Sequence, residues 1–573
     1  MSFLSRTLSL LVKLVVIGVA LVVIAGVVFY AHLNPSPPDK QAFVNGVVLT
    51  IDETDSIVEA VLVEGERIVA VGTNEEIRSQ LDAGAEVVDL QGKTLMPGFI
   101  DAHGHFPGSG LSAVAVDLNS PPINKVKNID QALALLKEKA EQAPEGKWIV
   151  GFGYDDTALE DKRHFNKQEL DLVSNKHPIY ILHISGHMGV GNSLALSLGN
   201  ITAASPNPEG GEIIKDKAGE TTGLLLETAH KPMAKLAFNF PLLDRLKITD
   251  AAVKDYLSKG VTTAQNGLAA VDHIKGLWQA SQIGMVPLRL VLWPDEYVGE
   301  KLLAHELDYG NKKSDRFTIG AIKLVADGSI QGYTGFLKDP YFVQPKDSAG
   351  DYRGYPSLSE SELVRQVSEY HKAGYQLAIH GNGDAAIEMI INAYEKAQAE
   401  HHRQDARPII IHSQMITNEQ LDRVKALGMT PSFFAAHTYY WGDRHKNIFL
   451  GSERANRISP TRTAQEKEIP FTVHMDTPVV PMDPMLIIWN AANRETSSGN
   501  VLGKGERISI NQALRATTIN AAWQVFQEGN RGSIEVGKFA DLVILSENPL
   551  SEAVDIRNIK VEKTYIGGVA VYP

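Results

Sequence analysis

The sequence contains no cysteine in its 573 residues. This absence excludes disulfide frameworks, thiolate metal sites and cysteine nucleophiles, so any metal ion must be held by nitrogen and oxygen ligands. The sequence also lacks a run of basic residues, and its formal net charge is -13. A chain without a basic patch offers no electrostatic footprint for nucleic acid, and we exclude nucleic acid as a partner.

One long hydrophobic run is present, close to the N-terminus. Residues 10–30 are apolar except for Lys13, and about 20 such residues are enough to cross a bilayer. Arg6 and Lys13 lie towards its N-terminal side, so the positive-inside bias places the N-terminus in the cytoplasm. We therefore predict that residues 1–33 form a membrane anchor, with a cleaved signal peptide as the alternative. The catalytic part would then be extracytoplasmic, on the periplasmic side of an inner membrane or at the cell surface, beyond a Pro-rich spacer at 34–42.

Segments rich in β-branched residues occupy both ends of the remaining chain, at 43–97 and 528–573. Each is interrupted by glycine, at Gly65-Glu66 in the first segment and at Gly567-Gly568 in the second, which predicts a hairpin turn in each. We therefore predict one small β-sandwich domain built from both ends of the chain.

Residues 98–527 show a different pattern, in which short apolar runs alternate with helical periodicity. This alternation predicts an α/β fold and favours a parallel (β/α)8 barrel of the TIM type. The stretch at about 120–250 is longer than a βα unit requires and is rich in Gly, Asn and Ser. We predict that this stretch is an insertion that faces the substrate.

Polar residues follow the ends of several apolar runs. They are His103 and His105 after the first run, and then Lys323, His380, His412 and Asp476 in later runs. A parallel barrel brings the ends of its strands to one mouth, where imidazoles, a lysine and a carboxylate can surround a catalytic metal. His103 and His105 are two residues apart, so on an extended strand both imidazoles point to the same side. A satisfied buried histidine is the plainer alternative for any one of them.

Lys323 and Asp476 carry specific hypotheses. A lysine in a buried strand is costly unless it is paired, deprotonated or modified. Carboxylation of Lys323 by carbon dioxide would supply two oxygens to bridge two metals, whereas an ion pair with Asp327 is the alternative. Asp476 ends the run FTVHMD and is placed to accept a proton from metal-bound water, or else to cap the following loop.

Several motifs together resemble one family. PGFIDAHGH, IKLVADGS, HGNGDAA, IIIHSQ, HMDTPV and GSIEVGKFADLVIL are similar to motifs of the metal-dependent amidohydrolase superfamily, in the branch called amidohydrolase family 3 or YtcJ-like proteins. The resemblance implies metal ligands at His103, His105, His380 and His412, a carboxylatable lysine at Lys323, and a ligand and general base at Asp476. One position departs from some relatives: Ile411 stands where they carry an acid before the sixth-strand histidine, so Ser413 or Gln414 would have to orient His412 instead.

Three further histidines are predicted to bind substrate. His187 lies in the Gly-rich segment HISGHMGVGNS of the insertion, and His437 and His445 flank an aromatic stretch, Tyr439-Tyr440-Trp441. Aromatic surface with imidazoles suits an organic substrate with apolar bulk. An ordinary loop histidine and a structural aromatic plug are the alternatives.

The resemblance implies a metal-dependent hydrolase that cleaves a non-peptide carbon–nitrogen bond of the amide type in a small organic molecule. Metal-activated hydroxide would attack the carbonyl, with Asp476 as general base and His412 as a second catalytic residue. One or two divalent ions are expected, zinc foremost, although manganese, iron and cobalt also suit nitrogen and oxygen ligands. Hydrolysis of an ester or lactone, deamination, and a binding protein without catalysis stay open, as does a homo-oligomeric state.

Overall fold

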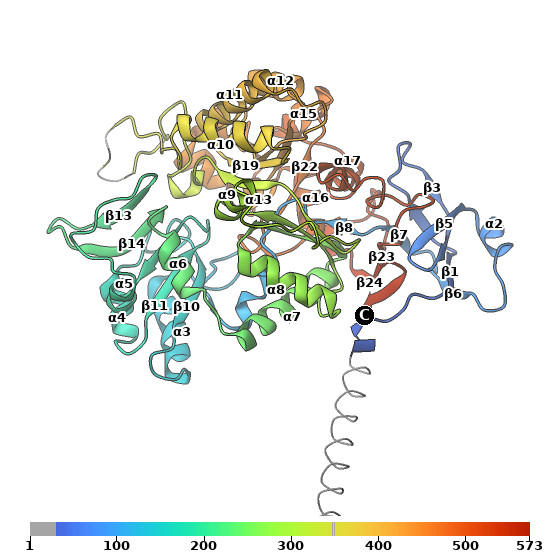
Figure 1. Ribbon diagram of the computed structural model, residues 1–573, viewed down its shortest axis with the longest axis horizontal. Coiled ribbons are helices and arrows are strands. Elements are labelled where there is room, and N and C mark those ends of the chain that lie inside the picture. The colour runs from blue at the N-terminus through green and yellow to red at the C-terminus, as the bar shows by residue number, and fades with distance from the viewer. Residues whose placement is uncertain (1–29, 32, 346–347, 349) are drawn as a thin grey trace, which may run out of the picture.

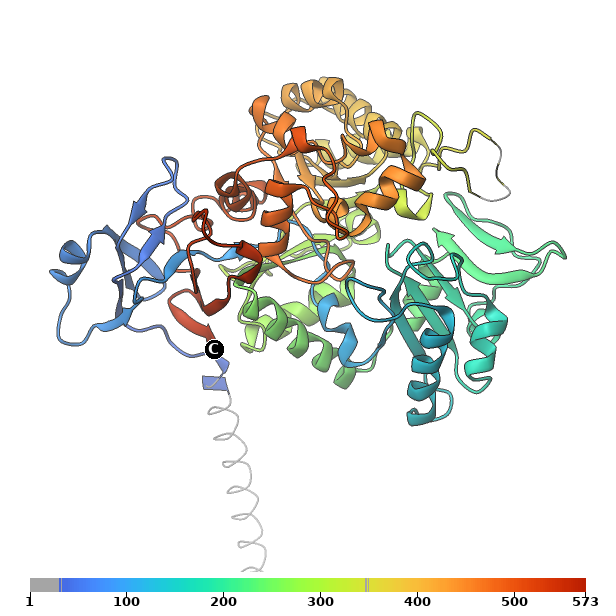
Figure 2. The ribbon, with the colours of Figure 1, turned by 180° about the vertical axis from the view of Figure 1, so that it is seen from behind.

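Three bodies of structure lie in a row in the computed structural model, which describes residues 30–31, 33–345, 348 and 350–573. A βα barrel occupies the centre, a β-sandwich lies on one side, and the chain segment that follows the first barrel strand forms a separate sheet on the other side (Figures 1 and 2). The two outer bodies flank the barrel in both views, so residues from distant parts of the sequence meet at its surface.

The barrel consists of parallel strands from two hydrogen-bonded sheets. The first contains β8 (Phe99–Ile100), β15 (Val261–Ala269), β16 (Arg289–Pro294) and β17 (Phe317–Ile319). The second contains β18 (Ile322–Val325), β19 (Leu377–Gly381), β20 (Ile409–His412), β21 (Thr430–Phe433) and β22 (Thr472–Val473). At one seam the chain runs from β17 directly into β18, and Gly320 N in the link between them donates to Leu292 O of β16 at 2.8 Å. At the other seam, the residues that follow β22 and β8 are joined by a hydrogen bond from Asp476 N to His103 O at 3.1 Å. The sheet is thereby closed into a barrel, in which β17 and β18 together occupy one strand position.

The sequence explains why these strands are buried. Residues Ile409–His412 read IIIH and are buried throughout, as expected for a barrel strand covered on both faces. The following helix, α12 (Asn418–Ala426), begins with a reciprocal capping box between Thr417 and Gln420. Beyond its end, Gly428 adopts a positive φ of 63° that favours glycine. The predicted α/β fold is confirmed in this part of the chain.

The sandwich draws on both ends of the described chain. One sheet has the order β5-β4-β1-β6, from β1 (Lys40–Val44), β4 (Ala60–Glu64), β5 (Arg67–Gly72) and β6 (Glu86–Asp89). The other has the order β25-β24-β23-β7-β2-β3, from β2 (Val47–Leu49), β3 (Ile57–Val58), β7 (Thr94–Pro97), β23 (Leu542–Leu545), β24 (Val561–Ile566) and β25 (Val569–Tyr572). A buried ion pair between Arg289 and Asp541 joins barrel and sandwich, with Nη2 2.9 Å from Oδ1.

The third body lies between β8 and β15 in the sequence. Its sheet has the order β13-β14-β12-β11-β10-β9, from β9 (Val116–Asp117), β10 (Ile149–Tyr154), β11 (Ile179–His183), β12 (Met188–Gly191), β13 (Gly211–Lys215) and β14 (Thr221–Glu227). The helices α3 (Ile129–Gln142), α4 (Lys167–Val173), α5 (Ser193–Leu198) and α6 (Lys231–Ala237) accompany it. The long helix α7 (Leu242–Ser258) then leads back to the barrel. We call this body the insertion sheet.

The predicted membrane anchor requires correction. The apolar run at residues 10–30 lies outside the described residues except for Tyr30. Within the described residues no helix is long and apolar enough to cross a membrane. The longest of those helices, α7 and α11 (Asp384–Glu400), have 17 residues each and carry several charged side chains, whereas about 20 apolar residues are needed. The structure thus contradicts the predicted transmembrane helix, and with it the membrane partner and the membrane-anchored, extracytoplasmic location.

Candidate metal centre

The first and last strands of the barrel bring His103, His105 and Asp476 together. Asp476 N donates to His103 O, and His105 N donates to Thr477 O at 2.7 Å, so the loops after β8 and β22 run side by side. The Nε2 atoms of His103 and His105 lie 3.4 and 3.1 Å from Asp476 Oδ1. One ligand atom from each of the three residues falls within 4.8 Å of the others. The residues that the sequence predicted from two distant motifs therefore share one site.

The chemistry of these atoms fits a divalent cation. Asp476 Oδ1 is buried and has no hydrogen-bond partner among the described residues, although two imidazole nitrogens are close to it. His103 Nδ1 lies 3.1 Å from Gln265 Oε1, an acceptor, which assigns the proton to Nδ1 and leaves the Nε2 lone pair free. Two nitrogens and one oxygen that converge without bonding to one another are the donor set that zinc and similar metals bind.

Electrostatics keep these ligands in the protonation states that a metal requires. Burial, together with the neighbouring Lys323, lowers the pKa of His103 well below its usual range, so the ring is neutral. Burial alone would raise the pKa of Asp476, but His105, His103 and His412 hold it well below its usual range. A neutral imidazole and an ionised carboxylate are both competent ligands at neutral pH.

Lys323, on β18, points into the same site. Its Nζ lies 3.3 Å from His103 Nε2, and its side chain is buried. Burial lowers the pKa of Lys323 to about 7, although Asp476 opposes that shift. No ion pair links Lys323 to Asp327 in the described part of the chain, so the alternative considered from the sequence is not observed. A substantial fraction of the amine is therefore neutral near pH 7, the form that reacts with carbon dioxide.

His380 and His412 complete the ring of predicted ligands. Their imidazole centroids are 4.6 Å apart, and His412 Nε2 lies 3.8 Å from Asp476 Oδ2. His380 Nδ1 lies 3.3 Å from Asp327 Oδ1. Asp327 accepts hydrogen bonds from the backbone N–H groups of Asn382 and Gly383, at 3.0 and 2.8 Å, so it fixes the loop after β19 beside the ring.

His474 is the functional neighbour that the sequence reasoning missed. Its Nε2 lies 3.1 Å from His412 Nδ1, and its Nδ1 lies 2.9 Å from Ser432 Oγ. His474 is therefore the side chain that orients the His412 ring, in place of Ser413 or Gln414. Those two residues bond elsewhere, to Ile410 O and to His445 respectively. The signal was present in the sequence, because His474 precedes Asp476 by two residues and an extended chain places both on one face.

The three histidines predicted to bind substrate differ in position. The ring of His187, from the insertion sheet, lies 5.0 Å from the ring of His380, so it reaches the candidate centre. His437 follows β21, and its ring centroid is 6.0 Å from that of His412. His445 lies farther back, fully buried, with its ring 5.8 Å from His437. His187 and His437 therefore border two of the predicted ligands, His380 and His412, whereas His445 is separated from them by His437.

A second group of possible ligands lies at the insertion sheet and consists of Asp155, Asp156 and His183. Both oxygens of Asp155 are already engaged: Oδ1 accepts from Thr157 and Ala158, and Oδ2 accepts from Trp441 Nε1 and Arg444 Nη1 at 3.1 and 2.6 Å. A carboxylate with five donors has no free lone pair to offer a cation. This group instead fastens the insertion sheet to α13 (Ala436–Arg444), the helix after β21.

Comparisons with known proteins identify the family of the chain. Residues 86–572 match the profile of a family described as the amidohydrolase family. The chain is 30% identical to the N-substituted formamide deformylase of Arthrobacter pascens over 92% of its own length and 97% of that protein. It is 29% identical to the putative amidohydrolase YtcJ of Bacillus subtilis (strain 168), over 93% of this chain and 99% of that one.

Solved structures show the same fold. An uncharacterised metal-dependent hydrolase from Pyrococcus furiosus superposes with a TM-score of 0.69 at 25% sequence identity, covering 89% of this chain and all of that one. A second such hydrolase, from Pyrococcus horikoshii OT3, superposes with a TM-score of 0.72 at 24% identity, covering 91% of this chain and 99% of that one. The likeness extends across nearly the whole chain.

Proposed function

Because this chain belongs to the amidohydrolase family and is a hydrolase that acts on carbon–nitrogen bonds, we propose that it cleaves a non-peptide amide in a small organic molecule with a metal ion held at the candidate centre. N-substituted formamides are the first substrate class to consider, since the Arthrobacter pascens relative carries that name. The products would be formate and a free amine.

The convergence of His103, His105 and Asp476 carries the proposal. Asp476 Oδ1 is buried within 3.4 Å of two imidazole nitrogens and makes no hydrogen bond in the described part of the chain. Burying an ionised carboxylate without a partner is costly, so the arrangement is best accounted for by a cation that these atoms share. We assign His380 and His412 to the same ligand set, with Lys323 as a further ligand if it is carboxylated.

A bound divalent ion, zinc foremost, would polarise the substrate carbonyl and lower the pKa of a water molecule towards about 7. Residues of the protein then transfer the protons. Asp476 Oδ2, the oxygen that faces His412, accepts the proton of the attacking water and returns it to the leaving nitrogen, so that the carbon–nitrogen bond breaks to give an amine. His412, which His474 contacts through Nδ1, lies 3.8 Å from Asp476 Oδ2 through its Nε2 and so helps to keep the carboxylate in that orientation.

The insertion sheet and α13, the helix after β21, supply the rest of the substrate site in this proposal. His187 lies next to His380, and His437 lies next to His412. Tyr439 and Tyr440, on the same helix as His437, are partly buried. We propose that His187 and His437 contact the substrate, and that His445 supports His437.

A panel of matched substrates tests the proposed reaction. Purified protein loaded with zinc is incubated with two amides, N-benzylformamide and an N-benzyl amide whose acyl group is not formyl. The ester benzyl formate and a simple aminopurine complete the panel, and product release is followed by chromatography. We expect kcat/KM for the amides to be at least about tenfold above kcat/KM for the ester, after correction for the faster uncatalysed hydrolysis of the ester. A tenfold preference corresponds to about 1.4 kcal/mol of selective transition-state binding.

Preferential hydrolysis of benzyl formate, or release of ammonia from the aminopurine without amide cleavage, would contradict the amide assignment. Either outcome would favour the ester or deaminase alternatives on the same site. The protein treated with chelator is the control that separates enzymatic from background hydrolysis.

A further inference from the structure

Glu227 is a buried carboxylate for which the proposed reaction has no role. It ends β14 in the insertion sheet, and its side chain is only 3% exposed. Its backbone φ is +50°, in the left-handed region that a residue with a side chain rarely adopts. Strain of this kind persists where surrounding structure enforces it, and such positions concentrate at functional sites.

The Glu227 side chain pairs with His187. Glu227 Oε2 lies 2.8 Å from His187 Nδ1, while Oε1 is buried without a partner among the described residues. The backbones are joined as well, because Glu227 N donates to His187 O at 2.7 Å. A carboxylate on Nδ1 assigns the proton to that atom and fixes the ring plane. His187 Nε2 has no hydrogen-bond partner within the described ranges, so it is the nitrogen left for a ligand.

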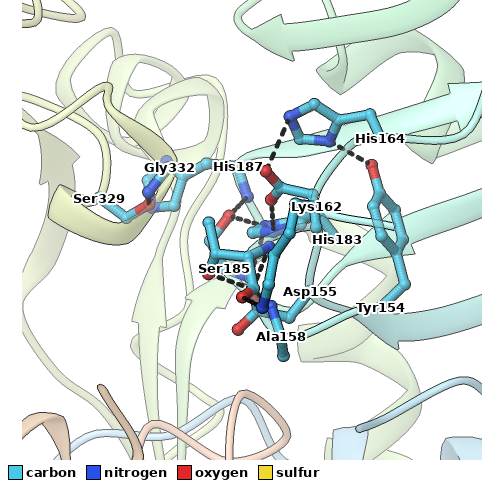
Figure 3. A network of polar contacts seen from close by, with 12 residues as sticks. Tyr154, Asp155, Ala158, Lys162, His164, His183, Ser185, His187, Ser329 and Gly332 are labelled. Atoms are coloured by element: carbon cyan, nitrogen blue, oxygen red, sulfur yellow. Dashed lines mark hydrogen bonds and ion pairs between the residues drawn. The ribbon is translucent and has the colours of Figure 1, made fainter. Parts of the chain in front are cut away.

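The turn that carries His187 is itself held in place. His187 N donates to Ser185 Oγ at 3.2 Å, and Ser185 Oγ lies 2.8 Å from His183 Nδ1. His183 Nε2 in turn lies 3.1 Å from Asp156 Oδ1. Figure 3 shows this chain of contacts, with Ser185 between His183 and His187. The turn between β11 and β12 is therefore anchored to the end of β10.

The barrel approaches Glu227 from the other side. Gly328 follows Asp327 directly, and a Cβ atom at Gly328 would lie 2.1 Å from Glu227 Oε1. Only glycine allows that approach, so the loop after β18 packs directly on the carboxylate. Asp327 in the same loop lies 3.3 Å from the ring nitrogen of His380, and the ring of His380 lies 5.0 Å from that of His187. Glu227 thus stands between the insertion sheet and the candidate metal centre.

We propose that Glu227 is a positioning residue that holds His187 against the metal centre, so that His187 Nε2 contacts the amide group of the bound substrate. This inference rests on the proposed amide hydrolysis. It assigns the insertion sheet a direct part in the reaction, since one histidine and its carboxylate partner come from a body outside the barrel.

A double-mutant cycle between Glu227 and His187 tests the positioning role. Glu227→Gln keeps the size and an acceptor oxygen, Glu227→Ala removes both, and His187→Gln removes the imidazole. With His187 present we expect kcat/KM to fall about 10-fold for Glu227→Gln and about 100-fold for Glu227→Ala, the range typical when a partner that orients a functional histidine is lost. In the His187→Gln background, the same changes at Glu227 should alter kcat/KM less than twofold, because the two residues act as one unit. Glu212→Gln, on the neighbouring strand β13 and exposed, is the matched control.

Additive losses in the double variants, with metal content and melting temperature unchanged, would overturn the proposal. A second measurement needs neither substrate nor a variant of Glu227. The imidazole ¹⁵N signals of His187, assigned by their absence in His187→Gln, should show a protonated Nδ1; a bare Nδ1 would overturn the proposal even in active enzyme. If the wild-type protein hydrolyses no amide but Nδ1 is protonated, the proposed function fails while the Glu227–His187 pairing stands.

Discussion

Replacing Asp476 by asparagine should lower kcat by about 10²- to 10⁴-fold, the usual contribution of a positioned general base. Asparagine keeps the shape of the side chain and an oxygen that can face His103 and His105, but it cannot take up a proton. The three imidazoles around Asp476 hold its pKa well below its usual range, so the side chain is ionised at neutral pH. The measurement is kcat on the best amide of the panel, together with metal content by elemental analysis.

Asp422→Asn is the control for this substitution, since Asp422 lies on α12 with its side chain 64% exposed and pairs only with a surface lysine. We expect its kcat to be unchanged. A wild-type kcat in the Asp476→Asn variant with metal bound would contradict the assignment of Asp476 as the general base. Loss of metal from that variant would instead show that Asp476 is needed to bind the metal, and the loss of kcat could then not be assigned to proton transfer.

Replacing His103 by asparagine should remove both the metal and the activity. His103 is fully buried, its Nε2 faces Asp476 and Lys323, and Gln265 fixes its ring, so no other side chain can take over its lone pair. Loss of an outer partner of a metal ligand already costs about 10- to 100-fold in metal affinity, and loss of the ligand itself should cost at least that much. The measurement is the affinity for zinc, from competition with a chromogenic chelator.

The matched control is His402→Asn, at an exposed position beyond the end of α11. Its zinc affinity and turnover should equal those of the wild type. A His103→Asn variant that binds zinc with unchanged affinity would place the metal elsewhere and contradict the site built from β8 and β22.

The barrel part of this site could be predicted because its residues follow buried strands. In segments such as IIIH and FTVHMD, a short apolar run ends in a single polar residue, and the geometry of a parallel barrel brings such ends together. His474 was overlooked although strand alternation places it on the same face as Asp476, since the later residue carried the stronger chemical argument.

The contribution of the insertion sheet could not be derived in the same way. Glu227 ends the run LLLE, but nothing in that run connects it with His187, which lies 40 residues earlier. Their contact depends on how β12 and β14 pair, and on the approach of Gly328 from the barrel. The contact of Asp155 with Arg444, 289 residues later, likewise depends on tertiary packing. The predicted N-terminal membrane span is wrong, because no helix among the described residues is long and apolar enough to cross a membrane.

Elemental analysis of the protein purified without chelator tests the central claim most directly. We expect one or two divalent ions per chain, with zinc the most abundant. Two ions would support a carboxylated Lys323 as a bridge between them, and one would leave Lys323 as a neutral amine beside His103. A chain that contains no metal, and gains no hydrolytic activity when zinc, manganese or cobalt is added, would contradict a metal-dependent hydrolase at this site.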